Sequence, residues 1–137
     1  MGAIIVLADD DPDLRTIYAA VLRSEGHEVC EACDGTEAVA QVLEHRPTLL
    51  LLDVWMPGVN GFEVLERLRH DPAITTTKVV ILSNLGDADS CLEGFSGGVA
   101  DYWVKGLSLD DFRDRVREVL ARAELFSEPS PAEPSST

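Results

Sequence analysis

Short apolar segments alternate with amphipathic segments along most of the chain. The apolar segments have the length of buried strands, and we expect strands at residues 3–8, 27–32, 48–52, 78–82 and 101–104. Between them, apolar residues recur at helical spacing, which predicts helices from Pro12 to the stop at Gly26, at 36–45, 61–70 and 88–95, and after Ser108. This strict alternation predicts an α/β fold: a doubly wound, five-stranded parallel sheet flanked by five helices.

Polar residues that can carry chemistry follow the ends of the predicted strands. In doubly wound sheets, the ligand crevice lies outside the carboxyl ends of the strands. The residues at these positions are Asp9, Asp10, Asp53, Ser83 and Lys105. Two carboxylates about 4 Å apart repel by roughly 4 kcal/mol at an effective dielectric near 20, so the site requires a cation, a proton or a nearby Lys.

Mg²⁺ is the natural partner of such a carboxylate cluster, because it is a hard cation that prefers oxygen ligands. Lys105 supplies a second, fixed positive charge. A carboxylate in this setting can act as a nucleophile towards phosphorus, since the metal and the Lys neutralise the phosphoryl oxygens. Ser83 can then donate a hydrogen bond to the product.

Four segments resemble the signature blocks of response-regulator receiver domains in order and spacing. They are VLADDDP at 6–12, LLLLDVWMPGVNG at 49–61, VVILS at 79–83 and ADYWVK at 100–105. The resemblance covers about residues 3–124 and implies a flavodoxin-like sheet of the receiver type. We expect a receiver domain at 1–125, followed at 126–137 by a disordered Pro/Ser-rich tail or a truncated linker.

The resemblance implies that this is a phosphorelay signalling domain and not a turnover enzyme. Asp53 would accept a phosphoryl group from a sensor histidine kinase or a phosphotransfer protein. Asp10, Asp53 and the backbone carbonyl of Trp55 would ligate Mg²⁺, and Asp9 would help through a water molecule.

The resemblance also implies a conformational switch. Lys105 would pair with the phosphoryl group, Ser83 would move to hydrogen-bond it, and Tyr102 would turn inward in the active state. The surface around Tyr102 and the fourth and fifth helices would then bind a downstream protein. Homodimer formation on phosphorylation stays open.

Several residues depart from the receiver pattern. Gly106 replaces the proline that usually follows the Lys, so we expect a trans bond or a strained cis one, and a less firmly positioned Lys105. Asn84 stands where a very small residue is usual and would narrow access to Asp53, whereas the indole of Trp55 could shield an acyl phosphate from water. Three glycines predict a short or mobile fourth helix: Gly94, Gly97 and Gly98.

Other phosphate or metal chemistries fit less well. A haloacid-dehalogenase-type enzyme would need a second Asp where Trp55 stands. The alternating aspartates of residues 9–13 copy the first ligands of an EF-hand, but Leu14 replaces the required Gly and Ala20 the bidentate Glu. A flavodoxin-like cofactor binder would need a phosphate-binding loop after the first strand. The remaining rival is a degenerate receiver that binds a partner without being phosphorylated.

The composition narrows the list of partners. The 137 residues include 25 acidic and 11 basic side chains, and the net charge of −14 would repel a nucleic-acid backbone. No apolar stretch is long enough to span a bilayer, so we expect neither nucleic-acid nor membrane binding, and a cytoplasmic location.

The three cysteines form no recognisable framework. Two residues separate Cys30 from Cys33, and Cys91 stands alone. A structural zinc site needs four nitrogen or sulfur ligands, and no second Cys pair or nearby His pair supplies them. We therefore expect these cysteines to be small buried hydrophobes.

Overall fold

The computed structural model describes residues 2–56, 58–68, 71, 76–83 and 100–127, without the side chains of 124–127. Strands and helices alternate along this part of the chain. The strands are β1 Ile4–Ala8, β2 Glu28–Ala32, β3 Leu49–Asp53, β4 Lys78–Ser83 and β5 Asp101–Val104. The helices are α1 Pro12–Ser24, α2 Gly35–His45, α3 Gly61–Leu68 and α5 Leu109–Ser127.

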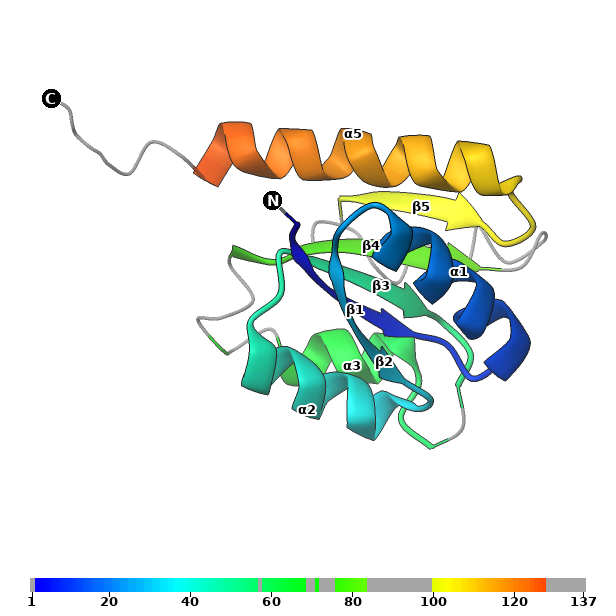
Figure 1. Ribbon diagram of the computed structural model, residues 1–137. Helices are drawn as coiled ribbons and strands as arrows, with labels where there is room; N and C mark the ends of the chain where they lie inside the picture. Colours follow the sequence, from blue (N-terminus) through cyan, green and yellow to red (C-terminus); the bar gives the residue numbers. More distant parts are fainter. Residues whose placement is uncertain (1, 57, 69–70, 72–75, 84–99, 128–137) are drawn as a thin grey trace, which may run out of the picture.

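The five strands form one parallel sheet in the order β2-β1-β3-β4-β5. Helices α1 and α5 cover one face, and α2 and α3 cover the other (Figure 1). The order changes direction between β1 and β3, because β1 pairs with β2 on one side and with β3 on the other. The carboxyl ends of β1 and β3 therefore lie at the switch point, where doubly wound folds place their ligands.

Alternate residues of the strands build the core on each face of the sheet. On the α1/α5 face, Ile5 and Leu7 pack with Tyr18, Trp103 and Phe112, whose rings contact one another. On the α2/α3 face, a second apolar cluster combines even-numbered residues of β1, β2 and β3 with the inner sides of the two helices. Side chains on strands alternate between faces, so both cores follow from the apolar strand sequences.

Local sequence signals set the helix starts. The Asp11 carboxylate accepts hydrogen bonds from the first turn of α1, and Pro12 is its first residue. The Asp34 carboxylate accepts from the backbone N–H of Glu37, and the Ser108 hydroxyl accepts from that of Asp111. These side chains satisfy N–H groups that a helix start leaves without partners.

The predicted fold is confirmed, with small shifts at the element ends. Asp53 and Ser83 are the last residues of β3 and β4, although both were expected just after their strands. The expected helix at 88–95 lies outside the described residues, as does the 126–137 tail beyond residue 127. The same holds for Asn84, Cys91, Gly94, Gly97 and Gly98. Among the described helices, none combines the length and the apolar composition needed to cross a membrane.

The expectation for the cysteines was wrong for one of them. Cys33 is exposed directly after the last residue of β2, where its backbone N–H donates to the Glu37 carboxylate at 2.9 Å. Cys30 is partly buried on β2 against the α2/α3 core, close to the expected environment. The contrast arises because Cys30 lies within β2, which packs against the α2/α3 core, whereas Cys33 follows the end of this strand.

Candidate functional site

Three carboxylates converge at the carboxyl ends of β1 and β3. Asp9 follows β1, Asp53 ends β3, and these strands are neighbours paired up to Ala8 and Leu52. Oxygens of Asp9, Asp10 and Asp53 all lie within 4.8 Å of one another. Asp9 and Asp53 are buried, whereas Asp10 is exposed at the edge of the cluster.

Lys105 brings a positive charge into this acidic cluster from the end of β5. Its Nζ lies 3.0 Å from Oδ2 of Asp53 and 3.1 Å from Oδ2 of Asp9. The Lys105 side chain is only 13% exposed, so these contacts are only weakly screened by water. One ammonium group thus compensates two buried carboxylates and leaves the cluster with a net negative charge.

The surroundings shift the pKa values of the two central groups. Burial raises the pKa of Asp53 to about 7; the Asp9 charge and Asp10 add to the rise, while Lys105 opposes it. For Lys105, burial alone would lower the pKa, but contacts with Asp53 and Asp9 outweigh burial and raise it. Lys105 therefore stays an ammonium, and Asp53 holds its proton unusually tightly unless another cation takes its place.

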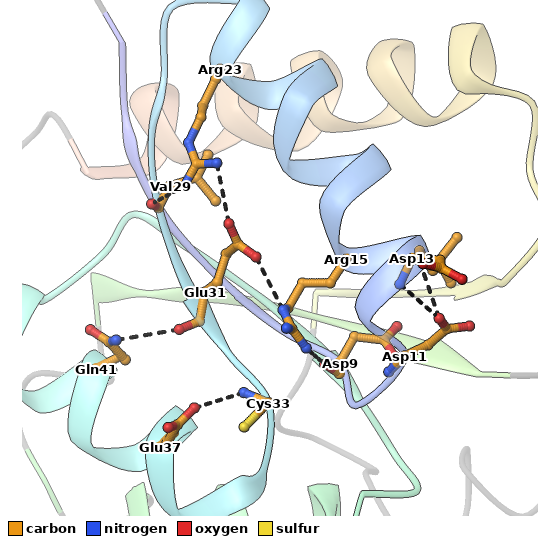
Figure 2. Close-up of polar contacts among 11 residues, drawn as sticks. Asp9, Asp11, Asp13, Arg15, Arg23, Val29, Glu31, Cys33, Glu37 and Gln41 are labelled. Atoms are coloured by element: carbon orange, nitrogen blue, oxygen red, sulfur yellow. Dashed lines mark hydrogen bonds and ion pairs between the residues drawn. The ribbon is translucent and has the colours of Figure 1, made fainter.

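Backbone geometry turns the Asp9 carboxylate into the site. Its Oδ1 accepts a hydrogen bond from the backbone N–H of Asp11 at 2.9 Å. The Asp11 carboxylate faces elsewhere, because it accepts from the N–H groups of Asp13 and Leu14 (Figure 2). Asp11 therefore caps α1, and of the three consecutive aspartates it is Asp9 and Asp10 that join Asp53 in the acidic cluster.

Arg15 supports the same loop from α1, a role that the sequence did not reveal. Its Nη1 donates to the Asp9 carbonyl at 2.7 Å, and its Nε pairs with Glu31 of β2 at 3.1 Å (Figure 2). Arg23 binds the other Glu31 oxygen at 3.2 Å. The end of β1 is thus tied to α1 and β2 by a network that only the tertiary arrangement brings together.

Backbone atoms of the loop after β3 lie close to Asp53. The N–H of Trp55 donates to Oδ1 of Asp53 at 3.3 Å, while the Trp55 indole is 51% exposed. The indole meets the Phe62 ring edge-on, with 6.2 Å between the ring centroids. A Cβ on Gly61 would lie 2.9 Å from the Asp53 carbonyl oxygen, so glycine permits this close return of the chain.

The predicted switch residues lie on β4 and β5 beside Lys105. Ser83 is buried, and its carbonyl accepts the backbone N–H of Lys105 at 2.7 Å. Tyr102 lies on β5, is partly buried, and packs at the border of the α2/α3 core. Lys105, Ser83 and the three aspartates thus share one edge of the sheet, whereas Tyr102 lies three residues further back along β5.

The peptide after Lys105 is trans, since no cis peptide bond occurs among the described residues. Gly106 adopts a φ of 96°, a left-handed conformation that favours glycine. Without the usual proline, Lys105 still contacts both Asp53 and Asp9. Tyr18 also reaches this region: burial raises its pKa, and the Gly106 backbone hydrogen-bonds it.

The donor set of the acidic cluster suits a hard divalent cation. Three carboxylates from two adjacent loops offer oxygen ligands, and Asp10 keeps one side open for water or substrate. Mg²⁺ is usually bound by one or two carboxylates together with water and substrate oxygens. The residues present therefore fit a Mg²⁺ ion.

The fold and the site define an α/β domain whose doubly wound parallel sheet carries an acidic cluster and a lysine at its switch point. The chain matches the family described as the response regulator receiver domain over residues 5–117, and it belongs to this family.

Curated relatives from several bacteria share this similarity. The DNA-binding response regulator MtrA of Mycolicibacterium smegmatis is 37% identical over 88% of this chain and 51% of its own length. The DNA-binding dual master transcriptional regulator RpaA of Synechocystis sp. is 33% identical over 88% of this chain and 50% of its own length. The chain thus spans about half the length of the curated relatives it matches.

Solved structures agree with the fold. The receiver domain of a Francisella response regulator has a TM-score of 0.77 and 28% identity, over 88% of this chain and 98% of that one. NtrX from Brucella abortus has a TM-score of 0.82 and 28% identity, over 93% of this chain and 28% of that one.

Proposed function

We propose that this domain is a phosphoacceptor that takes a phosphoryl group onto Asp53. The observation that carries the proposal is the position of Lys105 Nζ, which lies between the buried carboxylates of Asp53 and Asp9. An ammonium placed there can pair with the phosphoryl oxygens as the Asp53 carboxylate attacks phosphorus. The domain acts as a signalling acceptor and not as a turnover enzyme.

The donor would be the phosphohistidine of a sensor histidine kinase or a phosphotransfer protein. An Asp53 oxygen forms the new P–O bond while the P–N bond breaks, and the electron pair returns to the imidazole. Ser83 at the end of β4 would donate a hydrogen bond to the acyl phosphate.

Mg²⁺ would be held by Asp10, Asp53 and the Trp55 carbonyl, with Asp9 acting through water. When bound, the ion would offset negative charge on the phosphoryl oxygens and on the carboxylates. In support, the three carboxylates lie within 4.8 Å of one another with only one Lys among them.

The signal would leave through the surface around Tyr102 and the fourth and fifth helices, to a downstream protein. The partly buried position of Tyr102 beside the end of β5 is compatible with a rotamer change. We expect a cytoplasmic location and no direct nucleic-acid binding by this chain, because it carries a net charge of −14. Homodimer formation on phosphorylation remains a question for solution measurements.

The proposal is tested by incubating the protein with Mg²⁺ and acetyl phosphate and measuring its intact mass. We expect one added phosphoryl group on the wild type and none on Asp53→Asn. Asp11→Asn is the matched control, because Asp11 caps α1 outside the acidic cluster. A wild type that gains no phosphoryl group with acetyl phosphate, or with any histidine kinase tested, would instead favour a degenerate receiver.

A further inference from the structure

A second group of metal-binding side chains lies away from the acidic cluster. Ligand atoms of Glu28, Cys30 and His45 all lie within 4.8 Å of one another. Within the described part of the chain, this group and the three aspartates are the two such clusters. Carboxylate, thiol and imidazole form a mixed donor set, which differs chemically from the all-oxygen set around Asp53.

The fold brings these three residues together from two elements. Glu28 and Cys30 are two positions apart on β2, so their side chains point to the same face of the sheet. That face carries α2, and His45 is the last residue of this helix. Helix α2 returns along the sheet towards the start of β3, so its end lies near the start of β2 (Figure 1).

The group is separated from the acidic cluster along the sheet. Cys30 pairs with Val6, three residues before Asp9, which corresponds to about 10 Å along β1. Glu28 lies further back, opposite Ile4. A cation bound here would not share ligands with Asp53.

The spacing suits a tetrahedral ion after small side-chain adjustments. Zinc binds sulfur at about 2.3 Å, nitrogen at about 2.0–2.1 Å and carboxylate oxygen at about 2.0–2.2 Å, which places ligand atoms about 3.5 Å apart. The upper limit of 4.8 Å therefore requires the atoms to close by little more than about 1 Å. Glu28 is exposed and His45 is half-buried at a helix end, so both can move.

We propose that Glu28, Cys30 and His45 form a binding site for Zn²⁺, with the fourth ligand position taken by water. Zinc is favoured over Mg²⁺ because a thiolate and an imidazole are ligands of borderline and soft cations. Binding forms the zinc–sulfur bond and displaces the thiol proton of Cys30 to solvent.

The surrounding charges favour a cation at this position. Burial raises the pKa of the Cys30 thiol, and the negative charges of Glu28 and Glu44 raise it further, while Arg23 opposes them. Arg23 itself is engaged by the Glu31 carboxylate and the Val29 carbonyl on the other face of β2. A bound Zn²⁺ would supply the positive charge that stabilises the Cys30 thiolate against burial and against these two carboxylates.

Spacing along the sequence does not reveal this group. A structural zinc site takes four nitrogen or sulfur ligands, and the Cys30 and Cys33 pair cannot supply them. In the structure Cys33 is exposed and contacts Glu37, while Cys30 has Glu28 of the same strand and His45 from the end of α2 as neighbours.

Co²⁺ is a spectroscopic probe that distinguishes this site from the acidic cluster. Co²⁺ bound to a thiolate gives a near-ultraviolet charge-transfer band, whereas Co²⁺ held by carboxylates alone does not. We titrate the reduced protein with Co²⁺ in excess Mg²⁺, then displace Co²⁺ with Zn²⁺. The expected result is one thiolate-bound Co²⁺ per chain that Zn²⁺ displaces.

Matched variants assign the ligands. The band should persist in Cys33→Ser and Cys91→Ser and vanish in Cys30→Ser. His45→Gln and Glu28→Gln should each weaken Co²⁺ binding by at least about tenfold, since even indirect supports of a metal site cost that much. These two changes lie at partly or fully exposed positions, so they test the site even if Cys30→Ser disturbs folding.

The proposal is overturned by a wild type without the band, or by a band that depends on Cys33 or Cys91 instead of Cys30. Unchanged affinity in both His45→Gln and Glu28→Gln would overturn it as well. None of these outcomes bears on phosphorylation of Asp53, so this inference and the proposed function can fail separately.

Discussion

Lys105 is the residue on which the chemistry of the acidic cluster depends most. It is the counter-charge to two buried carboxylates that come from different strands, at 3.0 and 3.1 Å. Without Lys105, no positive charge would offset the buried carboxylates of Asp53 and Asp9. A carboxylate that is buried beside another negative charge takes up a proton. A protonated Asp53 is a poor nucleophile.

Replacing Lys105 with Met should therefore slow phosphorylation by acetyl phosphate by on the order of 100-fold, the usual effect of losing one charge-stabilising donor. The rate is measured by intact-mass spectrometry over time at fixed Mg²⁺. Lys78→Met, at the start of β4 and the opposite end of the sheet, is the matched control and should retain the wild-type rate. Equal rates in Lys105→Met and wild type would show that the ammonium plays no part.

Trp55 is placed to affect the lifetime of the phosphorylated state. Its backbone N–H contacts Asp53, and its indole lies half-exposed against Phe62. We expect Trp55→Ala to shorten the dephosphorylation half-life several-fold, because the indole would no longer restrict water at the acyl phosphate. Trp55→Phe retains an aromatic ring and should have a smaller effect. An unchanged half-life in Trp55→Ala, measured by the decay of the phosphorylated mass, would refute this role.

At the scale of elements, the start of α2 is locked against the loop that follows Asp53. A Cβ on Gly35 would lie 1.9 Å from the Val59 carbonyl oxygen and 2.6 Å from its carbon. Both contacts are with backbone, which cannot move aside cheaply. The first turn of α2 therefore helps to fix the loop that carries Trp55 and Asn60.

Gly35→Ala should accordingly lower the free energy of unfolding by about 3 kcal/mol, at the upper end of the usual cost of overpacking. Urea unfolding followed by circular dichroism measures the change. Thr36→Ala, one residue on and exposed, is the control and should change stability by less than about 0.5 kcal/mol. If the two variants are equally stable, the close packing of α2 on Val59 does not contribute.

For the whole molecule, bound Mg²⁺ and folding should be linked. The folded-state pKa of Asp53, about 7, is above its ordinary value of 3.8, so the folded state binds the proton more tightly. Ionisation of Asp53 then costs stability progressively as pH rises from about 4 to 7. Above that range the carboxylates repel one another, and a bound cation offsets the repulsion.

Mg²⁺ at 100 times its Kd should stabilise the wild type by about 2.7 kcal/mol, seen as a higher Tm that EDTA reverses. NaCl at matched ionic strength controls for screening of the net charge of −14. Asp53→Asn should lose most of the Mg²⁺ effect. A Tm shift that is the same in NaCl, or the same in Asp53→Asn, would contradict a metal site at this position.

The sequence predicted the sheet and the positions at its edge because both depend on local patterns. Apolar strands, and helix caps such as Asp11 and Ser108, can be recognised from the sequence alone. In a parallel sheet the carboxyl ends of the strands lie at the same edge, so the residues that follow them come together. Contacts between distant segments were not predictable. Arg15 on the Asp9 carbonyl, Val59 against Gly35, and His45 beside Cys30 all depend on how the helices pack, which spacing along the chain does not encode.

The measurement that tests the central claim most directly is chemical mapping of the phosphorylated residue. Protein treated with Mg²⁺ and acetyl phosphate is reduced with borohydride, which converts an aspartyl phosphate to homoserine, and its peptides are sequenced by mass spectrometry. We predict homoserine at position 53 alone. Homoserine at position 9 or 10, or at no aspartate, would contradict the assignment of Asp53 as the phosphoryl acceptor.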